Sequence, residues 1–98
     1  MREYEVTLIL QPNLEEAERS EVIERVTGWL KDATDGQAES LKAAHWGQRQ
    51  LAYEIKRHKD GYYLYYEATL DPAKIKDIEQ NARFNENIIR YLFVRKDE

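Results

Sequence analysis

The sequence has 98 residues, of which 42% are hydrophobic and 35% charged, a balance typical of one small soluble globular domain over residues 1–98. It contains no cysteine, which excludes disulfides, zinc–thiolate sites and a cysteine nucleophile, and it has no apolar run long enough to span a membrane. The formal net charge of −4 argues weakly against nucleic-acid binding, because nucleic-acid-binding proteins usually carry a basic surface.

This charge is unevenly distributed along the chain. Residues 1–40 contain four Lys or Arg against ten Asp or Glu, whereas residues 41–98 contain eleven against nine. Segment 42–59 is the most basic, with five cations and one acid. A partner responds to the local field rather than to the average charge. The second half of the chain can therefore meet an anionic partner.

The first half of the chain predicts a strand followed by a helix. Residues 3–10 alternate between apolar and polar side chains, which is typical of a half-buried strand. Asn13 is predicted to cap the following helix, with Glu16 at the capping-box position. The apolar stripe from Leu14 onward predicts a helix of about 20 residues that ends near Gly36.

The second half predicts two more strands, a helix and a last strand. Residues 38–56 form a long strand candidate, interrupted by a bulge at Gly47. Residues 58–61 end in Asp-Gly and predict a hairpin turn before a tyrosine-rich strand over 62–70. Asp71-Pro72 is a typical helix start, and residues 88–96 predict the last strand.

The order β-α-β-β-α-β indicates an α+β fold of the ferredoxin-like type. In this fold one four-stranded antiparallel sheet carries both helices on one face. Right-handed crossovers predict that the fourth strand lies next to the first, followed by the third and the second.

The sheet face without helices is predicted to be unusually apolar. A sheet face that is exposed to water is normally polar in antiparallel sheets. In this chain the alternation places apolar residues such as Ile88 on that face, and it places Ile89 toward the helices. We interpret the exposed apolar positions as a protein-contact surface, and the alternative is that such residues simply favour strands. Stacking of RNA bases on the tyrosines is a further, less favoured interpretation. The predicted contact residues are Ile9, Tyr63, Tyr65, Leu92 and Val94.

A set of cations on the strands and the hairpin is suited to binding phosphates. Its members are Arg2, Arg49, Lys56, Arg57, Lys59, Arg90, Arg95 and Lys96. The alternative is that these charges are solvated and protect strand edges from aggregation.

Enzymatic chemistry is not predicted. His45 and His58 are isolated and have no metal-ligand spacing, no nucleophile signature surrounds Ser20 or Ser40, and no glycine-rich phosphate loop is present. We therefore expect no catalytic residue, metal, cofactor or small-molecule substrate.

Three sequence blocks resemble the bacterial small-subunit ribosomal protein six family, including its plastid relatives. They are MREYEVTLILQPNL, WGQRQLAYEIKRHKDGYYLYYEA and NIIRYLFVRK, and the likeness covers essentially the whole chain. Glu54 departs from the family, which commonly has proline there. The resemblance implies a ferredoxin-like structural protein that binds the central domain of 16S-type ribosomal RNA together with small-subunit protein eighteen. It makes the eight cations candidates for phosphate contacts and places the protein on ribosomes, in the cytoplasm or in a plastid stroma.

A second interpretation stays open. An apolar open sheet face also suits a ferredoxin-like module that homodimerises through this face, either for protein interaction or for sensing a ligand.

Overall fold

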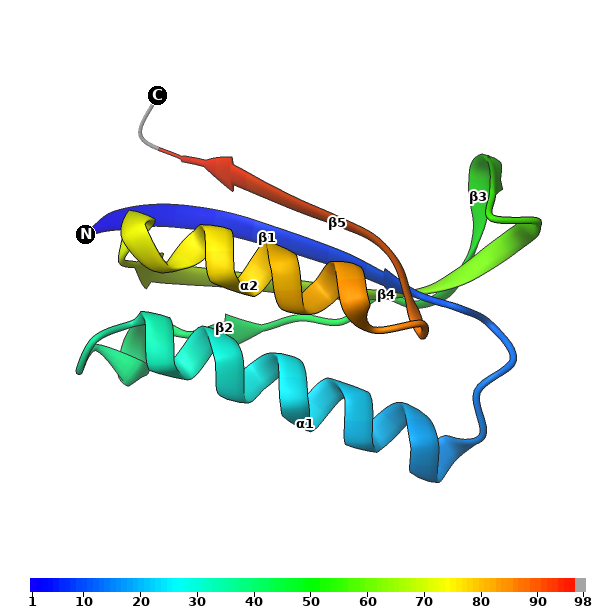
Figure 1. The fold of residues 1–98 in the computed structure, drawn as a ribbon, viewed down its shortest axis with the longest axis horizontal. Coiled ribbons are helices and arrows are strands. Elements are labelled where there is room, and N and C mark those ends of the chain that lie inside the picture. The colour runs from blue at the N-terminus through cyan, green and yellow to red at the C-terminus, as the bar shows by residue number, and fades with distance from the viewer. Residues whose placement is uncertain (97–98) are drawn as a thin grey trace.

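A computed structural model describes residues 1–96 and confirms the ferredoxin-like fold. The elements are β1 (Arg2–Leu10), α1 (Glu16–Ala33), a short 3-10 helix (Ala38–Ser40), β2 (Lys42–Ala43), β3 (Gly47–Ile55), β4 (His58–Leu70), α2 (Pro72–Phe84) and β5 (Ile88–Arg95). The antiparallel sheet has the order β5-β1-β4, with β2 and β3 both pairing to the outer side of β4. The predicted strand order is confirmed, and Figure 1 shows both helices beneath the sheet.

The predicted long strand over 38–56 is divided into three pieces. Residues 38–40 form the 3-10 helix, and the strand that follows is interrupted between Ala43 and Gly47. Gly47 has a φ of +77°, a conformation that side chains of L-residues rarely adopt. The glycine therefore redirects the chain between β2 and β3, and the sheet has five strands rather than the predicted four.

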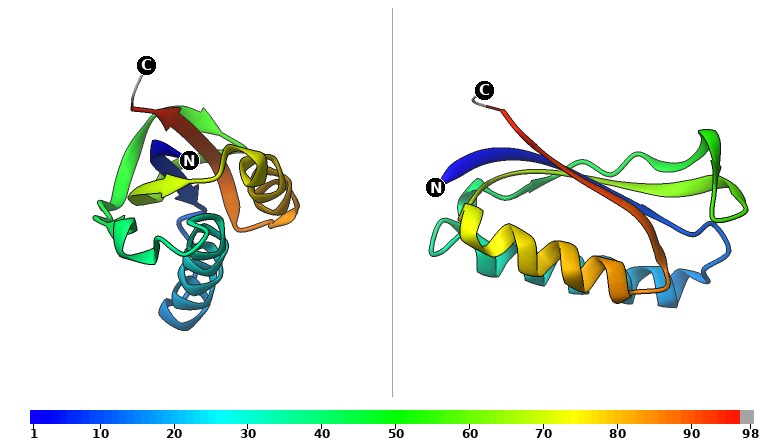
Figure 2. Two further views of the ribbon diagram at one scale, coloured as in Figure 1. Left: turned by 90° about the vertical axis from the view of Figure 1, so that its left-hand side faces the viewer. Right: turned by 45° about the horizontal axis from the view of Figure 1, so that its top comes forward.

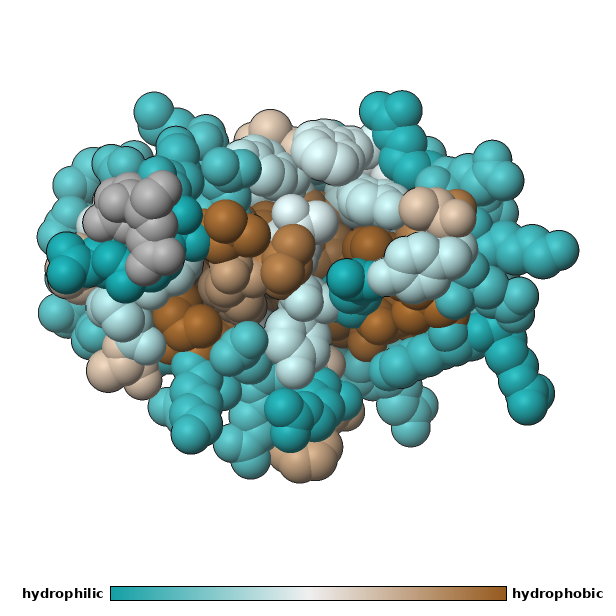
Figure 3. All heavy atoms as spheres, turned by 90° about the horizontal axis from the view of Figure 1, so that it is seen from above, coloured by the Kyte–Doolittle hydropathy of each residue, from teal (hydrophilic) through white to brown (hydrophobic). Residues whose placement is uncertain are grey.

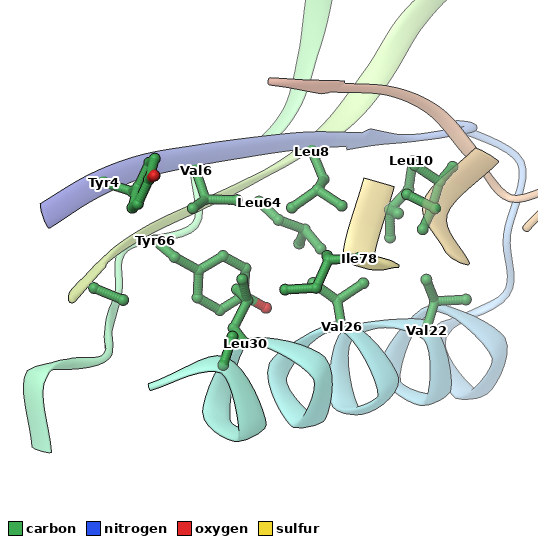
Figure 4. Packing of buried hydrophobic residues seen from close by; sticks show 14 of the residues in the cluster. Tyr4, Val6, Leu8, Leu10, Val22, Val26, Leu30, Leu64, Tyr66 and Ile78 are labelled. Atoms are coloured by element: carbon green, nitrogen blue, oxygen red, sulfur yellow. The ribbon is translucent and has the colours of Figure 1, made fainter. Parts of the chain in front are cut away.

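The core lies between the helices and one face of the sheet (Figure 2). Alternate residues of β1 and β4 point down onto α1, as Val6, Leu8 and Leu64 do, and Val26 and Leu30 meet them from the helix (Figure 4). The period of two in the strands and of 3.6 in the helix places these side chains in one layer.

Helix α1 begins two residues later than the sequence predicts. The predicted cap was Asn13, but the cap is Glu15, whose N–H donates to the side chain of Glu18 at 3.4 Å. The N–H of Asn13 instead donates to the side chain of Gln11 at 2.8 Å, in a turn before the helix. Asn13 therefore belongs to a turn that precedes the helix and does not cap it. The predicted start of α2 is correct, because the Asp71 side chain accepts from the N–H of Ala73.

The hairpin turn was predicted at 58–61 but lies at Lys56 and Arg57. Both residues have positive φ, 48° and 70°, and Ile55 pairs with His58 across them. This is the geometry of a two-residue hairpin turn, which glycine or asparagine usually occupies. The Asp-Gly pair at 60–61 is instead part of β4.

The predicted faces of Ile88 and Ile89 were exchanged. Ile88 belongs to the main core, whereas Ile89 packs with Ile9 and Leu51 on the opposite side of the sheet. The pairing of β1 with β5 shifts register between Ile9 and Leu10, and a shift of one residue reverses which side chains face each side.

Candidate RNA and protein interface

The sheet face that the helices leave uncovered, which we call the open face, carries a band of apolar side chains. Figure 3 looks onto this face and shows hydrophobic side chains along its middle, with hydrophilic ones around them. A small second cluster lies here, formed by Ile9, Leu51 and Ile89 with Ile55 and Tyr63 against it. The open face therefore has its own packing, independent of the main core.

The hairpin of residues 47–61, which we call the arm, extends the open face at one end. Figure 1 shows its β3 strand rising away from the helices. A hollow of about 270 Å³ lies between the arm and the sheet, with Leu51 and Ile55 on the arm side and Thr7 and Leu92 on the sheet side. An apolar hollow of this kind suits an apolar side chain of a partner.

The rim of the hollow carries an arginine and a tyrosine from different strands. Arg90 of β5 donates a hydrogen bond to the hydroxyl of Tyr53 on β3. Its guanidinium also lies 5.7 Å from the centre of the Tyr53 ring, within the range of a cation–π contact. This pair connects the arm to the far edge of the sheet.

Trp46 forms an aromatic stack on the same face. Its ring lies 5.7 Å from that of Tyr63 and 5.6 Å from that of Tyr65, with interplanar angles of 18° and 15°. The hydroxyl of Tyr65 donates to Glu5 at 2.9 Å. Desolvation and the Glu5 carboxylate raise the pKa of Tyr65, so this hydroxyl keeps its proton as a donor.

The five predicted contact residues differ in how much surface they offer. Ile9 is 6% exposed and fills the space under the arm, so it supports the surface from below. Tyr63 and Tyr65 are half-buried, and the ring of Trp46 stacks on both. Leu92 and Val94 are 50% and 45% exposed, respectively, and present the most accessible apolar area of the set.

The predicted cations separate into two groups at opposite ends of the sheet. Four lie on the arm, and Lys56 and Arg57 stand at its tip. Arg90 of β5 pairs with Ile9 and lies near the arm, and the other three are at the chain termini, where Tyr4 pairs with Arg95. Eight residue steps along β1 separate the two ends, a distance of about 27 Å. The arm group consists of Arg49, Lys56, Arg57 and Lys59, and the terminal group of Arg2, Arg95 and Lys96.

Besides Arg90, which bonds to Tyr53, Lys96 and Arg49 also contact polar groups within the chain. Nζ of Lys96 donates to Glu67 at 2.9 Å, and this hydrogen bond raises the pKa of Lys96. Nε of Arg49 donates to the carbonyl of Trp46 at 3.2 Å. The Lys96 charge is thus partly neutralised by Glu67, whereas the Arg49 contact leaves its charge available to an anion.

Sequence reasoning missed three residues of this surface, namely Trp46, Leu51 and Tyr53. Leu51 and Tyr53 are two residues apart in a segment whose alternation predicts a strand, so they were expected to share one face of that strand. Only the bend of the arm over the sheet brings that face to the hollow.

Within residues 1–96 no three His, Asp or Glu side chains gather in a way that could hold a metal ion. None of the helices described is both long and apolar enough to cross a membrane.

The comparisons with known proteins identify the family. The family model described as ribosomal protein S6 matches residues 3–95. The chain belongs to the ribosomal protein S6 family. Among solved structures it is similar to 30S ribosomal protein S6 from Thermotoga maritima, with a TM-score of 0.85 and 29% sequence identity over 98% of this chain and 88% of that one. Membership confirms the resemblance and gives the chain a structural role in the small ribosomal subunit, in a family of ribosomal components rather than of enzymes.

Proposed function

We propose that this chain binds small-subunit ribosomal RNA through the cations of its arm and holds small-subunit protein eighteen against its open face. The observation that carries this proposal is the position of the arm cations beside the apolar band of the same face. One partner can contact the band while phosphates contact the cations next to it. The specific partners come from the family resemblance, and the geometry supports two adjacent contacts of different chemistry.

The arm is the part of the molecule best suited to phosphate. Its tip carries Lys56 and Arg57 side by side in a tight turn, where long side chains can spread into solvent. Contacts to phosphate need cations within reach rather than a fixed sequence spacing. The terminal group is less suited, because Lys96 is already paired with Glu67.

Binding to a fragment of the ribosomal central domain, with protein eighteen present, tests the RNA contact. If four arm cations each neutralise one phosphate on a duplex, the slope of log K against log salt should be about −3.6. Replacing the tip by Lys56→Asn with Arg57→Gly removes two charges and installs the preferred Asn-Gly turn, so the fold should be kept. The slope should then decrease in magnitude by about 1.8.

A matched control removes two cations from the helix side. Lys76 and Arg83 are exposed on α2, away from the open face, and the pair Lys76→Gln with Arg83→Gln causes the same change in net charge. This control should leave the salt slope unchanged. Equal losses in both double variants would mean that total charge, not the arm, governs binding and would contradict the RNA proposal.

The protein contact is tested with Leu92→Ser combined with Val94→Ser. Both side chains are about half exposed, so their replacement should keep the chain folded and weaken binding of protein eighteen by at least about tenfold. Unchanged affinity would show that the partner uses another face. If the purified chain instead forms a stable homodimer that the same substitutions disrupt, the homodimer interpretation replaces this one.

A further inference from the structure

A second surface lies on the other side of the molecule, in a groove of about 530 Å³ between the helices. Helices α1 and α2 are in contact and run side by side beneath the sheet (Figure 1). The apolar part of the groove is formed by Val22 and Trp29 of α1 and by Phe84 at the end of α2. Phe84 is 73% exposed, so the core of this chain does not use it.

The charged part of the groove is acidic. Glu18, Glu21 and Glu86 line it, and Arg25 is the one base among its described lining residues. Arg25 is itself paired with Glu21 at 3.5 Å, one helical turn away. Two carboxylates therefore face the groove without a compensating cation from its lining. The segment that contains α1, residues 1–40, has the most acidic balance of the chain.

Aromatic and acidic groups together define the chemistry of an occupant. A lone exposed aromatic residue is ordinary on a protein surface. Here Phe84 and Trp29 line one hollow with Val22 at its base, which gives an apolar side chain a place to bind. The surrounding carboxylates favour Lys and Arg and disfavour acidic segments or phosphates. The groove is thus complementary to a basic peptide that carries an apolar anchor.

We propose that this groove docks a Lys- and Arg-rich segment of another protein, with an aliphatic side chain placed against Phe84 and Trp29. Its cations would pair with Glu18 and Glu86, which line the same groove. This site goes beyond the proposed RNA and sheet-face contacts. Because groove and open face lie on opposite sides of the molecule, both can be occupied at once.

Trp29 provides a direct reporter for the test. The sequence has two tryptophans, and Trp46→Phe leaves Trp29 as the single one, inside the groove. The probe is an acetylated decapeptide of alternating lysines and arginines with a central pair of leucines, titrated into this variant. We expect a saturable change in Trp29 emission. Phe84→Ala and Glu86→Gln, introduced separately, should each raise Kd by about fivefold or more.

Two controls separate the groove from general charge attraction. Glu24 is exposed on α1 outside the groove, so Glu24→Gln removes the same charge and should change Kd less than about twofold. A second peptide with serines in place of the leucines should bind at least about fivefold more weakly. Equal effects of Glu24→Gln and Glu86→Gln, or equal binding of both peptides, would overturn the proposal.

A second copy of this chain is the competing occupant, since its arm is basic. Sedimentation of the free chain distinguishes this case: dimers that Phe84→Ala dissociates would make the groove a self-interface and overturn the proposal. The proposal is also separable from the sheet-face contact. Leu92→Ser with Val94→Ser should leave peptide binding unchanged, and Phe84→Ala should leave the binding of protein eighteen unchanged.

Discussion

Gly61 of β4 lies so close to Ile9 of β1 that no side chain fits at position 61. A Cβ placed there would overlap Cγ2 of Ile9 and lie 3.4 Å from both the carbonyl oxygen of Leu10 and Cδ2 of Leu51. The φ of Gly61 is not in the left-handed region, so this glycine is required for space rather than for conformation. The contact lets the arm approach the sheet and close the hollow on the open face.

Gly61→Ala should therefore destabilise the protein by about 1–3 kcal/mol, because an added methyl group forces its neighbours apart in a packed site. Urea unfolding followed by circular dichroism measures the change. Ile9→Leu removes the β-branch methyl that Gly61 faces, so the double variant should recover part of the loss. Strictly additive effects of the two substitutions would contradict the proposed clash.

Gly28→Ala, in contrast to Gly61→Ala, should increase the stability of the protein. Gly28 is inside α1, and nothing lies within 4 Å of a Cβ placed there. Alanine favours the helix over glycine by about 1 kcal/mol, partly by restricting the unfolded chain. We expect a higher urea midpoint with an unchanged m-value. A loss of stability at this position would mean that α1 packs differently from the described structure.

The hydroxyls of Thr27 and Tyr66 form a partly buried pair across the helix–sheet layer, 2.9 Å apart. The hydroxyl of Thr27 also donates to the carbonyl of Ile23 at 2.7 Å. Because Tyr66 is completely buried, its hydroxyl needs a hydrogen-bond partner within the protein. Thr27→Val keeps the shape but leaves the tyrosine hydroxyl without this partner, which should cost about 1–3 kcal/mol. Thermal or urea unfolding measures the loss.

Tyr66→Phe provides the matched control for that substitution. Combined with Thr27→Val, it removes both polar groups together and should restore part of the stability. If the double variant is no more stable than Thr27→Val alone, the loss does not come from the unsatisfied hydroxyl.

The parts of the fold that could be predicted depend on periodic burial and on local capping. The alternation of Tyr4, Val6 and Leu8 and the Asp71-Pro72 start of α2 are both found in the structure, because each is determined by residues adjacent in sequence. Strand order followed from the handedness of the crossovers.

Apart from the cap of α1, the main errors arose where the position of a residue depends on contacts with a segment that is distant in sequence. Gly61 was interpreted as a turn residue because Asp-Gly pairs are common in hairpin turns. In the structure it instead leaves room for the side chain of Ile9, fifty-two positions earlier in the chain. The turn is instead made by Lys56 and Arg57, which no turn propensity favours. The exchange of Ile88 and Ile89 likewise depends on a register shift against β1.

The candidate site was predictable in outline only. Leu92 and Val94 are exposed on the open face as the alternation predicts. Trp46 was missed because its stacking on Tyr63 and Tyr65 depends on the turn at Gly47, which separates β2 from β3. Proximity between segments of this kind is set by tertiary packing and leaves no local pattern.

His45 should make the stability depend on pH. Its Nδ1 accepts a hydrogen bond from the N–H of Tyr65 at 3.2 Å, and its ring meets the edge of Tyr66. Only the unprotonated Nδ1 can accept, and burial lowers the pKa of His45 below its usual 6.5. Between the lowered pKa of the folded state and 6.5, the unfolded chain binds more protons, so the free energy of unfolding rises with pH. The contribution is fully present above 6.5 and is lost as pH falls through the folded pKa.

His45→Asn isolates this effect, because the amide oxygen of asparagine can replace Nδ1 as an acceptor and does not titrate. Urea unfolding of both proteins between about pH 8 and pH 5 should show the original chain losing stability relative to the variant as pH falls. The two proteins differ only at position 45, so the difference between the two curves reports His45 alone. A difference that does not change with pH would mean that His45 has the same proton affinity in the folded and unfolded states, which is incompatible with its buried acceptor role.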